Sequence, residues 1–454
     1  MIGDVGRAQG AACARRLQST PAWAAGWRAA LLLVMVVAAG CGPNPAPATS
    51  VPSPTPSATA TTSAVATLTP APSPTPGGAL DDVVLRLWLV EPLAPSGQVP
   101  AVLLEQLGAF SEQYPNVTFD VRVKVPSGPD GVLEVLRSTL SVAQRALPDL
   151  VLLGRSDLLS AAGSGVIQRL EGRLPDEILG DWFPVGRAMG TVNNELFGVA
   201  YVLDAQHLVY RRSAFSQPPL RLDDVLLAPA PYLFPAGISD TVVGQYLAGG
   251  GRLVDAAGQA VVDEGPLLEV LRVHEQAVRE GIVSATVLEY DNADSFVGDF
   301  VNGMSSLAHV NASTYLRRSA EMPNTDIALV PAHDGPSVTV TTGWSWAMVT
   351  TDPDRQALAL ELLEWLMRPE NLGAFSRASR VLPAQRTALQ IWDDERYSAF
   401  AEAMLDDAVP RPASGARLTT ARALQEALRN VLLERLTAEE AARAAANSVN
   451  PPDT

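Results

Sequence analysis

Residues 83–125 have the sequence VVLRLWLVEPLAPSGQVPAVLLEQLGAFSEQYPNVTFDVRVKV, in which apolar side chains recur at three different spacings. The first eight residues are apolar except for one arginine, a run of strand length that ends at a Glu-Pro pair. In the last nine residues apolar and polar side chains alternate, as in a half-buried strand. Between these runs, four large side chains fall at helical spacing on one face, so the order is strand, helix, strand. The helical face consists of Leu103, Leu107, Phe110 and Tyr114.

The same alternation of helix and strand continues beyond residue 125. Val132, Leu136 and Leu140 recur at helical spacing, and residues 150–153 form an apolar run typical of a fully buried strand. Repeated units of this kind indicate a parallel sheet with right-handed crossovers. Because open parallel sheets bind ligands beyond the carboxyl ends of their strands, polar residues that follow the predicted strands are candidates for ligand contact.

The second half of the chain is predicted to contain several long helices. Pro266 opens one helix, and Asp352 precedes Pro353 as the N-cap of another. Near the end of the chain, Thr437 and Glu440 have the spacing of a capping box. The expected fold class is therefore α/β with a helical C-terminus.

The first eighty residues have the composition of an export signal and a tether. Residues 29–40 are apolar or small, follow several arginines, and are too few to span a bilayer, as expected of a secretory signal. The small residues before Cys41 resemble the bacterial lipobox, in which cleavage precedes a lipidated cysteine; an ordinary signal peptide with an incidental cysteine is the alternative. Residues 42–78 are almost wholly Pro, Ser, Thr, Ala and Val, which favours solvated, extended geometry. We expect a signal peptide at residues 1–40 and a tether that begins with lipidated Cys41 and ends at residue 80.

Charge, hydropathy and cysteine content limit the expected partners, membrane contacts and disulfides of the chain. The formal net charge of −16 argues against nucleic acid and anionic lipid surfaces as partners. After residue 80 no stretch is apolar for long enough to cross a bilayer, so the lipid anchor is the expected membrane contact. Cys13 and Cys41 are the two cysteines, and cleavage before Cys41 would leave no pair for an internal disulfide.

Several short signatures occur in an order that resembles a known protein family. The sequence PDLV at residues 148–151 precedes GVIQRL at residues 165–170. After these come LFGVAY at residues 196–201, LVYRR at residues 208–212 and GGGRL at residues 249–253. This order is similar to that of the family 1 extracellular solute-binding proteins, the receptors of ABC importers that include the maltose-binding proteins.

The resemblance implies a two-lobe, periplasmic-binding-protein-like fold of type II with a ligand cleft between the lobes. It places lobe 1 at residues 82–201 plus 332–372 and lobe 2 at residues 202–331 plus 373–450. A ligand that contacts both lobes only in the closed state would close the hinge by stabilising that state. The resemblance also implies a monomer on the outer face of the cytoplasmic membrane, which delivers a small solute, expected to be a sugar, to an ABC permease.

Two departures from the family pattern concern the ligand. Arg211 and Arg212 follow Tyr210, where the family normally has Asn and Lys. Gly343 is followed by Trp344, where a second glycine is usual, so a ring is added near the expected cleft. No specific ligand is therefore carried over from the family.

Aromatic side chains are the first candidates for a sugar site. A sugar presents apolar CH faces ringed by hydroxyl groups, so its site needs aromatic platforms surrounded by polar side chains. Trp344, Tyr315 and Phe234 are the candidate platforms, and packing inside a lobe is the alternative role for each. Trp88 lies within the first predicted strand and is expected to belong to the core.

Four polar residues complete the predicted ligand-binding set. Glu91 follows the first predicted strand and Asp157 follows the third. Asp204 lies just past the crossover, and Asn311 lies in the segment that resembles the family's ligand-contacting loop. A carboxylate at a strand end can instead cap a helix. Arg155 could pair with an anionic ligand but is interpreted as a solvated surface arginine.

Catalytic and cofactor motifs are weak throughout the chain. Ser345 lies in GWSWA, a loose nucleophile elbow, but the next residues predict a strand rather than the helix that this motif requires. The histidines lack metal-ligand spacing, and His274 lies on an apolar helix face typical of a core residue. We expect no catalytic residue, no metal and no cofactor. Two alternatives remain open: a surface interaction or sensor lipoprotein of the same fold and, less favoured, a secreted hydrolase.

Overall fold

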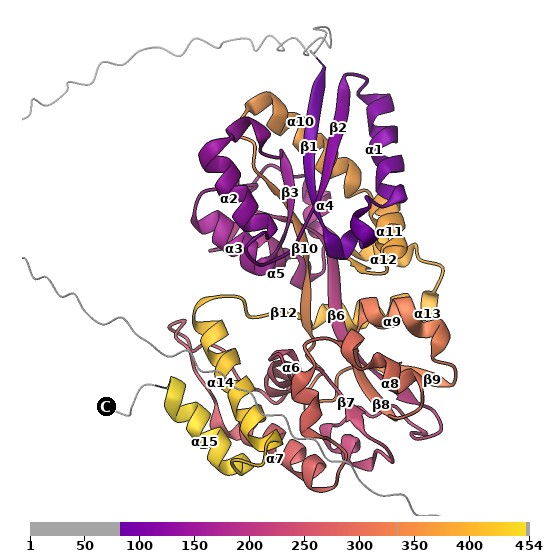
Figure 1. The fold of residues 1–454 in the computed structure, drawn as a ribbon, viewed down its shortest axis with the longest axis vertical. Helices are drawn as coiled ribbons and strands as arrows, with labels where there is room; N and C mark the ends of the chain where they lie inside the picture. The colour runs from indigo at the N-terminus through magenta and orange to yellow at the C-terminus, as the bar shows by residue number, and fades with distance from the viewer. Residues whose placement is uncertain (1–81, 334, 451–454) are drawn as a thin grey trace, which may run out of the picture. The chain divides into compact units, whose positions relative to one another are not determined.

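The computed structural model describes residues 82–333 and 335–450 of the chain (Figure 1). The predicted signal peptide, Cys41 and the tether lie outside these residues. Within the described part of the chain, no helix combines the length and the apolar character needed to cross a membrane.

The predicted strand, helix and strand are confirmed as β1 (Val83–Val90), α1 (Ala101–Gln113) and β2 (Val117–Lys124). β1 and β2 pair in parallel over their whole length, with α1 as the crossover between them. Tyr114 lies just past the end of α1 and stacks on Phe110, with ring centroids 4.3 Å apart. Local spacing of apolar residues therefore determines this unit.

Most strands of the described residues join one ten-stranded sheet, whereas β4 and β5 form a separate hairpin. The main order is β2-β1-β3-β10-β6-β8-β7, with β9 and β11 paired to β6 and β12 paired to β10. β1, β2 and β3 are parallel as predicted, and β10 runs antiparallel between β3 and β6. The remaining strands are β3 (Leu150–Gly154), β4 (Thr191–Val192), β5 (Glu195–Leu196), β6 (Val199–Arg211), β7 (Tyr232–Leu233), β8 (Leu307–Asn311), β9 (Thr325–Ala328), β10 (Val340–Met348), β11 (Leu382–Pro383) and β12 (Val409–Pro410).

Helices cover both faces of the sheet, with α2 and α3 on one side of the first strands and α1 on the other (Figure 1). The predicted N-cap is confirmed, since Asp352 accepts hydrogen bonds from two backbone N–H groups of the helix that follows it. The helices after α1 are α2 (Val132–Val142), α3 (Arg155–Gly163), α4 (Asp176–Gly180), α5 (Pro184–Gly190), α6 (Asp240–Ala248), α7 (Glu264–Arg279), α8 (Val297–Val301), α9 (Ala312–Arg318), α10 (Pro353–Leu366), α11 (Pro369–Ala378), α12 (Arg386–Gln390), α13 (Glu395–Asp406), α14 (Gly415–Leu432) and α15 (Ala438–Val449).

Two strands, β6 and β10, connect the two halves of the sheet. β6 pairs with β10 through residues 199–205 and with β8 through residues 206–210. The two strands approach closely at Gly343, where a Cβ atom would lie 2.3 Å from the Val202 carbonyl oxygen. Only glycine fits at this crossing.

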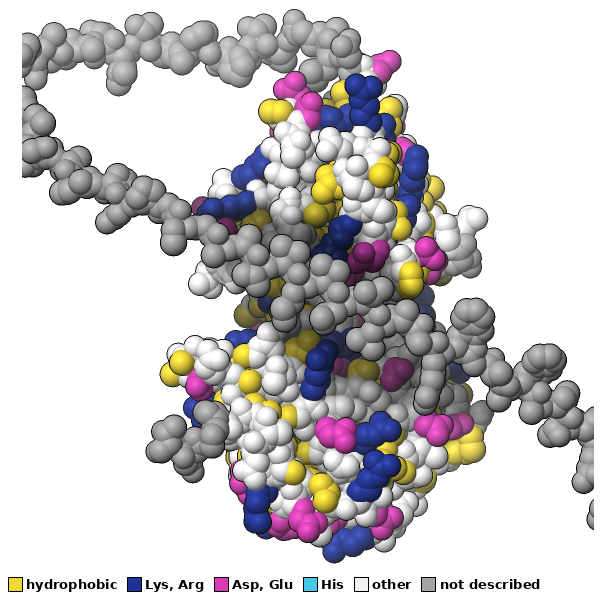
Figure 2. Space-filling view, turned by 60° about the vertical axis from the view of Figure 1, so that its left-hand side comes forward, with side chains coloured by type: hydrophobic (Ala, Val, Ile, Leu, Met, Phe, Trp, Pro, Cys, Tyr) yellow, Lys and Arg dark blue, Asp and Glu magenta, His cyan; other side chains and the backbone are white. Residues whose placement is uncertain are grey.

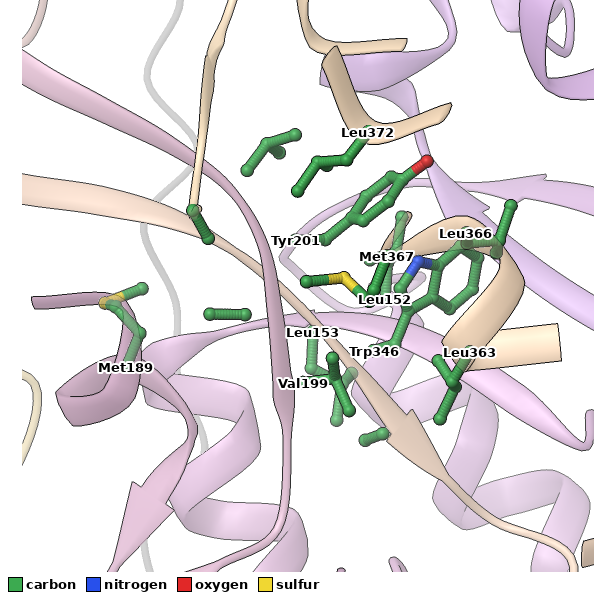
Figure 3. Close-up of a cluster of buried hydrophobic side chains, with 14 of the residues drawn as sticks. Leu152, Leu153, Met189, Val199, Tyr201, Trp346, Leu363, Leu366, Met367 and Leu372 are labelled. Atoms are coloured by element: carbon green, nitrogen blue, oxygen red, sulfur yellow. The ribbon is translucent and has the colours of Figure 1, made fainter. Parts of the chain in front are cut away.

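The first half of the sheet encloses one hydrophobic core (Figure 3). Tyr201 on β6 and Trp346 on β10 are fully buried there, with ring centroids 5.9 Å apart. Tyr201 also packs against Phe375 of α11 at 4.8 Å. Residues between 373 and 408, assigned to lobe 2 from the sequence, contribute to this first core because β11 pairs with β6 and brings α11, α12 and α13 against it.

The second half of the sheet packs against α7, α14 and α15 around a separate core. His274 of α7 is buried in it as predicted, with its Nε2 atom 2.8 Å from Gln245 Oε1. The predicted capping box at the start of α15 is also confirmed, since Thr437 and Glu440 each bond to the other's backbone N–H group. Helix caps and apolar helix faces were therefore predictable from local sequence.

Asp149 joins three elements of the first half of the sheet. Its Oδ2 atom accepts the Arg86 N–H of β1 at 2.8 Å, and its Oδ1 atom accepts Arg355 Nε–H of α10 at 2.7 Å. The residue is 2% exposed. Asp149→Ala would leave the Arg86 amide without this acceptor and the Arg355 guanidinium without its counter-charge, so we expect a loss of about 2–3 kcal/mol of unfolding free energy in urea denaturation. Asp120→Ala breaks an exposed ion pair with Arg122, should cost less than about 1 kcal/mol, and serves as the control; equal losses would contradict this role.

Candidate functional site

A pocket of about 570 Å³ lies beyond the carboxyl ends of β2 and β3, beside β10. Its position agrees with the edge of the sheet at which the sequence predicts ligand contact. Segments from β10 and from the connection between β12 and α14 close its other side. The lining residues are Pro126, Ser127, Gly154, Arg155, Ser156, Asp157, Met189, Thr341, Thr342, Gly343, Trp344, Arg411, Pro412, Ala413 and Leu418.

The first turn of α3 forms one wall of the pocket. β3 ends at Gly154, which is the N-cap of α3 and supplies no side-chain cap. The first N–H groups of a helix have no partner within the helix, so this turn offers hydrogen-bond donors and the positive end of the helix dipole. Asp157 belongs to the same turn, and burial raises the pKa of its carboxyl group. Its placement in the pocket wall follows from its position after the third strand.

Trp344 supplies the aromatic surface of the pocket. It lies on β10 opposite Gly154 of β3, and a Cβ atom at Gly154 would be 3.4 Å from the indole ring. The ring therefore lies against the backbone at the start of α3. Trp344 is half-buried, so part of the side chain remains accessible in the pocket.

Arg155 is not the solvated surface arginine expected from the sequence. Its side chain is half-buried in the pocket wall, and its Nη1 atom donates to the carbonyl oxygens of Ala188, Met189 (3.0 Å) and Thr191 (3.3 Å). These carbonyls lie at the end of α5, where a cation is favoured by the helix dipole. No carboxylate among the described residues lies within ion-pair distance of Arg155, whose guanidinium therefore lacks a counter-charge in the structure.

Arg411 extends the pocket wall from the opposite side. Its Nε atom donates to both carboxylate oxygens of Asp240 at 2.9 Å. Asp240 is 2% exposed at the start of α6, so the ion pair fixes the segment after β12 against this helix. The pocket thus joins the first half of the sheet to elements that pack on the second half.

Two further polar features lie at this side of the pocket. Thr341 is fully buried, lines the pocket, and its Oγ1 atom has no hydrogen-bond partner in the described part of the chain. α14 begins beside the pocket at Gly415, and its N-cap Ser414 makes no side-chain cap. The exposed Arg417 lies in the first turn of α14. Its charge lowers the pKa of Arg155, after the larger effect of burial.

Three predicted ligand residues, Asp204, Asn311 and Tyr315, lie near one another outside this pocket. Asp204 accepts the Ser313 N–H at 2.9 Å and the Ser313 hydroxyl at 2.8 Å, and so bonds to the first turn of α9. Asn311 is the last residue of β8, directly before α9. Tyr315 stacks on Tyr397 with ring centroids 5.2 Å apart. In this structure these residues contact the protein rather than the pocket.

The two other predicted residues also lie away from the pocket. Phe234 is fully buried between Tyr232, with ring centroids 4.9 Å apart, and His274, at 5.2 Å. It therefore fills the second core and is not available as a platform in this conformation. Glu91 is exposed in a short turn after β1 and does not line the pocket.

The structure therefore brings together Asp157 and Trp344 from the predicted set and adds residues that were not in that set. Arg155 carries the same signal as Asp157, since both follow the third strand. Arg411 and Thr341 lie far from them in the sequence and had no comparable signal.

The pocket supplies groups that can bind a small molecule, and Ser345 lies within a strand. Ser345 is 2% exposed, and β10 continues past it to Met348, as the sequence predicted, so no helix follows it. Among residues 82–333 and 335–450, no group of three or more His, Cys, Asp or Glu side chains is placed to hold a metal ion. The pocket can supply an aromatic surface, a carboxyl group and guanidinium donors to a small polar molecule.

Comparisons with known proteins agree with this description. The family model described as "Bacterial extracellular solute-binding protein" matches residues 109–402. No curated protein sequence matches the chain.

Three solved structures illustrate the similarity of fold. The sugar-binding protein MalE from Xanthomonas citri has a TM-score of 0.67 at 18% identity, over 81% of this chain and 96% of that one. Maltose-bound MalE3 from T. maritima has a TM-score of 0.64 at 17% identity, over 81% and 98%. An ABC transporter solute-binding protein from Thermotoga lettingae, bound with α-D-tagatose, has a TM-score of 0.62 at 19% identity, over 81% and 98%. At these identities the likeness establishes the two-lobe fold of type II.

Proposed function

Because the chain belongs to the bacterial extracellular solute-binding protein family, we propose that it is a receptor that binds a small carbohydrate and delivers it to an ABC permease. The observation that supports this most strongly is the pocket in which half-buried Trp344 lies beside Asp157 and guanidinium groups. An aromatic face with polar groups around it matches the CH faces and hydroxyl groups of a sugar. Maltose and α-D-tagatose in the similar structures are consistent with this ligand class.

The proposed mechanism is closure of the two halves of the sheet around the sugar. The pocket wall contains α3, which packs on the first half, and Arg411, which is held by Asp240 of α6. A ligand that contacts both walls stabilises the arrangement in which they lie close together. The strands β6 and β10 connect the halves and are the proposed hinge. We assign ligand contact to Asp157 and Trp344 from the predicted set.

The proposed location is the outer face of the cytoplasmic membrane, with Cys41 as the lipid anchor. The support is the sequence, in which a short apolar segment and small residues precede Cys41 and a Pro- and Ser-rich tether follows it. A monomeric receptor on such a tether can move between free solute and its permease. Mass spectrometry of the protein from membranes should detect an acylated Cys41 at the N-terminus, and an unmodified cysteine would contradict the anchor.

Calorimetric titration of the full-length chain against a panel of oligosaccharides, peptides, polyamines and polyols tests the ligand class. We expect saturable binding of at least one carbohydrate. Binding of a non-sugar alone would contradict the carbohydrate assignment. A chain that binds no solute at all would favour an interaction or sensor lipoprotein of the same fold.

Replacement of the aromatic platform tests the pocket itself. Trp344→Ala removes the half-buried ring, and we expect the affinity for the carbohydrate to fall by about 1–3 kcal/mol, the scale of a lost aromatic contact. The matched control is Trp365→Ala, which removes another half-buried tryptophan that lies outside the pocket lining. Unchanged affinity in a correctly folded Trp344→Ala protein would show that this ring only packs.

A further inference from the structure

Hydrogen bonds to backbone carbonyls hold the guanidinium of Arg155 in place, and one edge of the group forms no hydrogen bond within the described residues. Its Nη1 atom makes all the hydrogen bonds of this side chain in the described residues, to three carbonyl oxygens at the end of α5. Its Nε–H and Nη2–H groups have no partner there. This is the edge that binds a carboxylate through two parallel hydrogen bonds. Arg411 shows the same mode within this protein, since its Nε and Nη2 atoms donate to Asp240.

The surroundings of Arg155 favour an anion. The first turns of α3 and α14 both reach the pocket, and neither has a side-chain cap, so each presents free N–H groups and a positive dipole end. Arg417 adds a second cation that interacts with Arg155. The buried hydroxyl of Thr341, which has no partner among the described residues, is an independent sign of a missing polar ligand.

This concentration of arginine is local. The chain as a whole has a formal net charge of −16, and acidic and basic side chains are interspersed over the face shown in Figure 2. Asp157 is the carboxylate that lines the same pocket. Among the described residues, Asp157 forms no ion pair with Arg155, so its carboxylate does not occupy the unused edge of that guanidinium. Asp157 is thus available for sugar hydroxyl groups while Arg155 is available for an anion.

Resting on the proposed function, we infer that the solute is an acidic carbohydrate whose carboxylate binds the Nε and Nη2 edge of Arg155 between the first turns of α3 and α14. A uronic acid is the simplest such sugar. Trp344 would contact the ring face and Asp157 the hydroxyl groups. A neutral sugar would leave the guanidinium edge and the helix N–H groups to water.

Paired titrations of the full-length chain test this inference. The probes are oligosaccharides of equal length that differ in charge, such as oligogalacturonates against oligogalactosides and oligoglucuronates against maltodextrins. We expect at least one acidic member to bind about tenfold or more tightly than its neutral partner, and its affinity to fall as salt rises. Equal or tighter binding of every neutral partner would overturn the inference while leaving the carbohydrate receptor intact. Binding of neither class would instead contradict the proposed function.

Two variants of Arg155 test whether this side chain binds the ligand or only holds the end of α5 in place. Arg155→Gln should weaken the acidic sugar by about tenfold to a hundredfold and a neutral sugar by less than about twofold. Arg155→Lys keeps the charge but lacks the two-donor edge, so we expect an intermediate loss for the acidic sugar. The control Arg279→Gln removes an exposed arginine of α7 outside the pocket lining and should leave both affinities unchanged. An equal loss of acidic and neutral binding in Arg155→Gln would assign Arg155 a purely structural role.

Discussion

Lowering the pH from 7 to 5 is expected to reduce the unfolding free energy of this protein by roughly 2 kcal/mol for each of three buried histidines. Burial lowers the pKa of His207 and His274 to about 4 and that of His309 to about 3, with the charge of His207 adding to the effect on His309. The three side chains are at most 2% exposed. Their combined effect is comparable with the whole stability of a typical domain.

The sign follows from which state binds the proton first. The ordinary histidine pKa is about 6.5, so below that pH the histidines of the unfolded chain are protonated. In the folded chain the same side chains stay neutral until about pH 4 or below. Stability is therefore present above pH 6.5 and is lost as the pH falls through this window. Asp157 and Asp204 act in the opposite direction, because burial raises the pKa of each and the folded state is penalised as the pH rises. They reduce the net slope at acidic pH.

Urea denaturation at a series of pH values and constant ionic strength measures this effect. His274→Gln keeps a donor for Gln245 Oε1 and removes one titrating group, so it should remove about a third of the loss between pH 7 and pH 5. Stability that stays constant over this range in the natural sequence would contradict neutral, buried histidines.

The elements that local sequence determines were predictable. The strand, helix and strand at residues 83–125 follow from apolar spacing, and the caps at Asp352 and Thr437 follow from side chains that bond to backbone within three residues. Antiparallel insertion of β10 between β3 and β6 was not predictable from periodicity, because it joins strands separated by more than a hundred residues.

The candidate site was predictable only in part, for the same reason. The strand-end rule places Asp157 in the pocket, whereas the contact of Arg411 with Asp240 spans 171 positions of sequence. Residue type alone does not distinguish a ligand-contacting ring from a core ring. Phe234 was a candidate platform after Trp344, but it lies enclosed between Tyr232 and His274. Arg155 was misjudged because its burial depends on carbonyls at the end of α5.

The environments of Trp344 and Trp346 differ because the two residues lie at different places along the neighbouring strand β3. On a regular strand, residues two apart share one face of the sheet. The register shift between β10 and β6 leaves Tyr201 of β6 as the extra residue, whereas β10 pairs with β3 without a break. Trp344 lies opposite Gly154 at the end of β3, and Trp346 lies opposite Leu152 inside that strand. Trp344 is half-buried at the pocket, while Trp346 is fully buried beside Tyr201.

Trp346→Ala is therefore expected to lower the unfolding free energy by about 3–5 kcal/mol, because it leaves a cavity in the first core. Trp344→Ala should cost clearly less stability, since part of its surface is already exposed, and its main effect should be on ligand affinity. Urea denaturation and sugar titration of both variants, with Trp346→Phe as a folded reference that keeps a ring, measure the two effects. Equal losses of stability in the two variants would contradict these different roles, because both rings would then contribute equally to the first core.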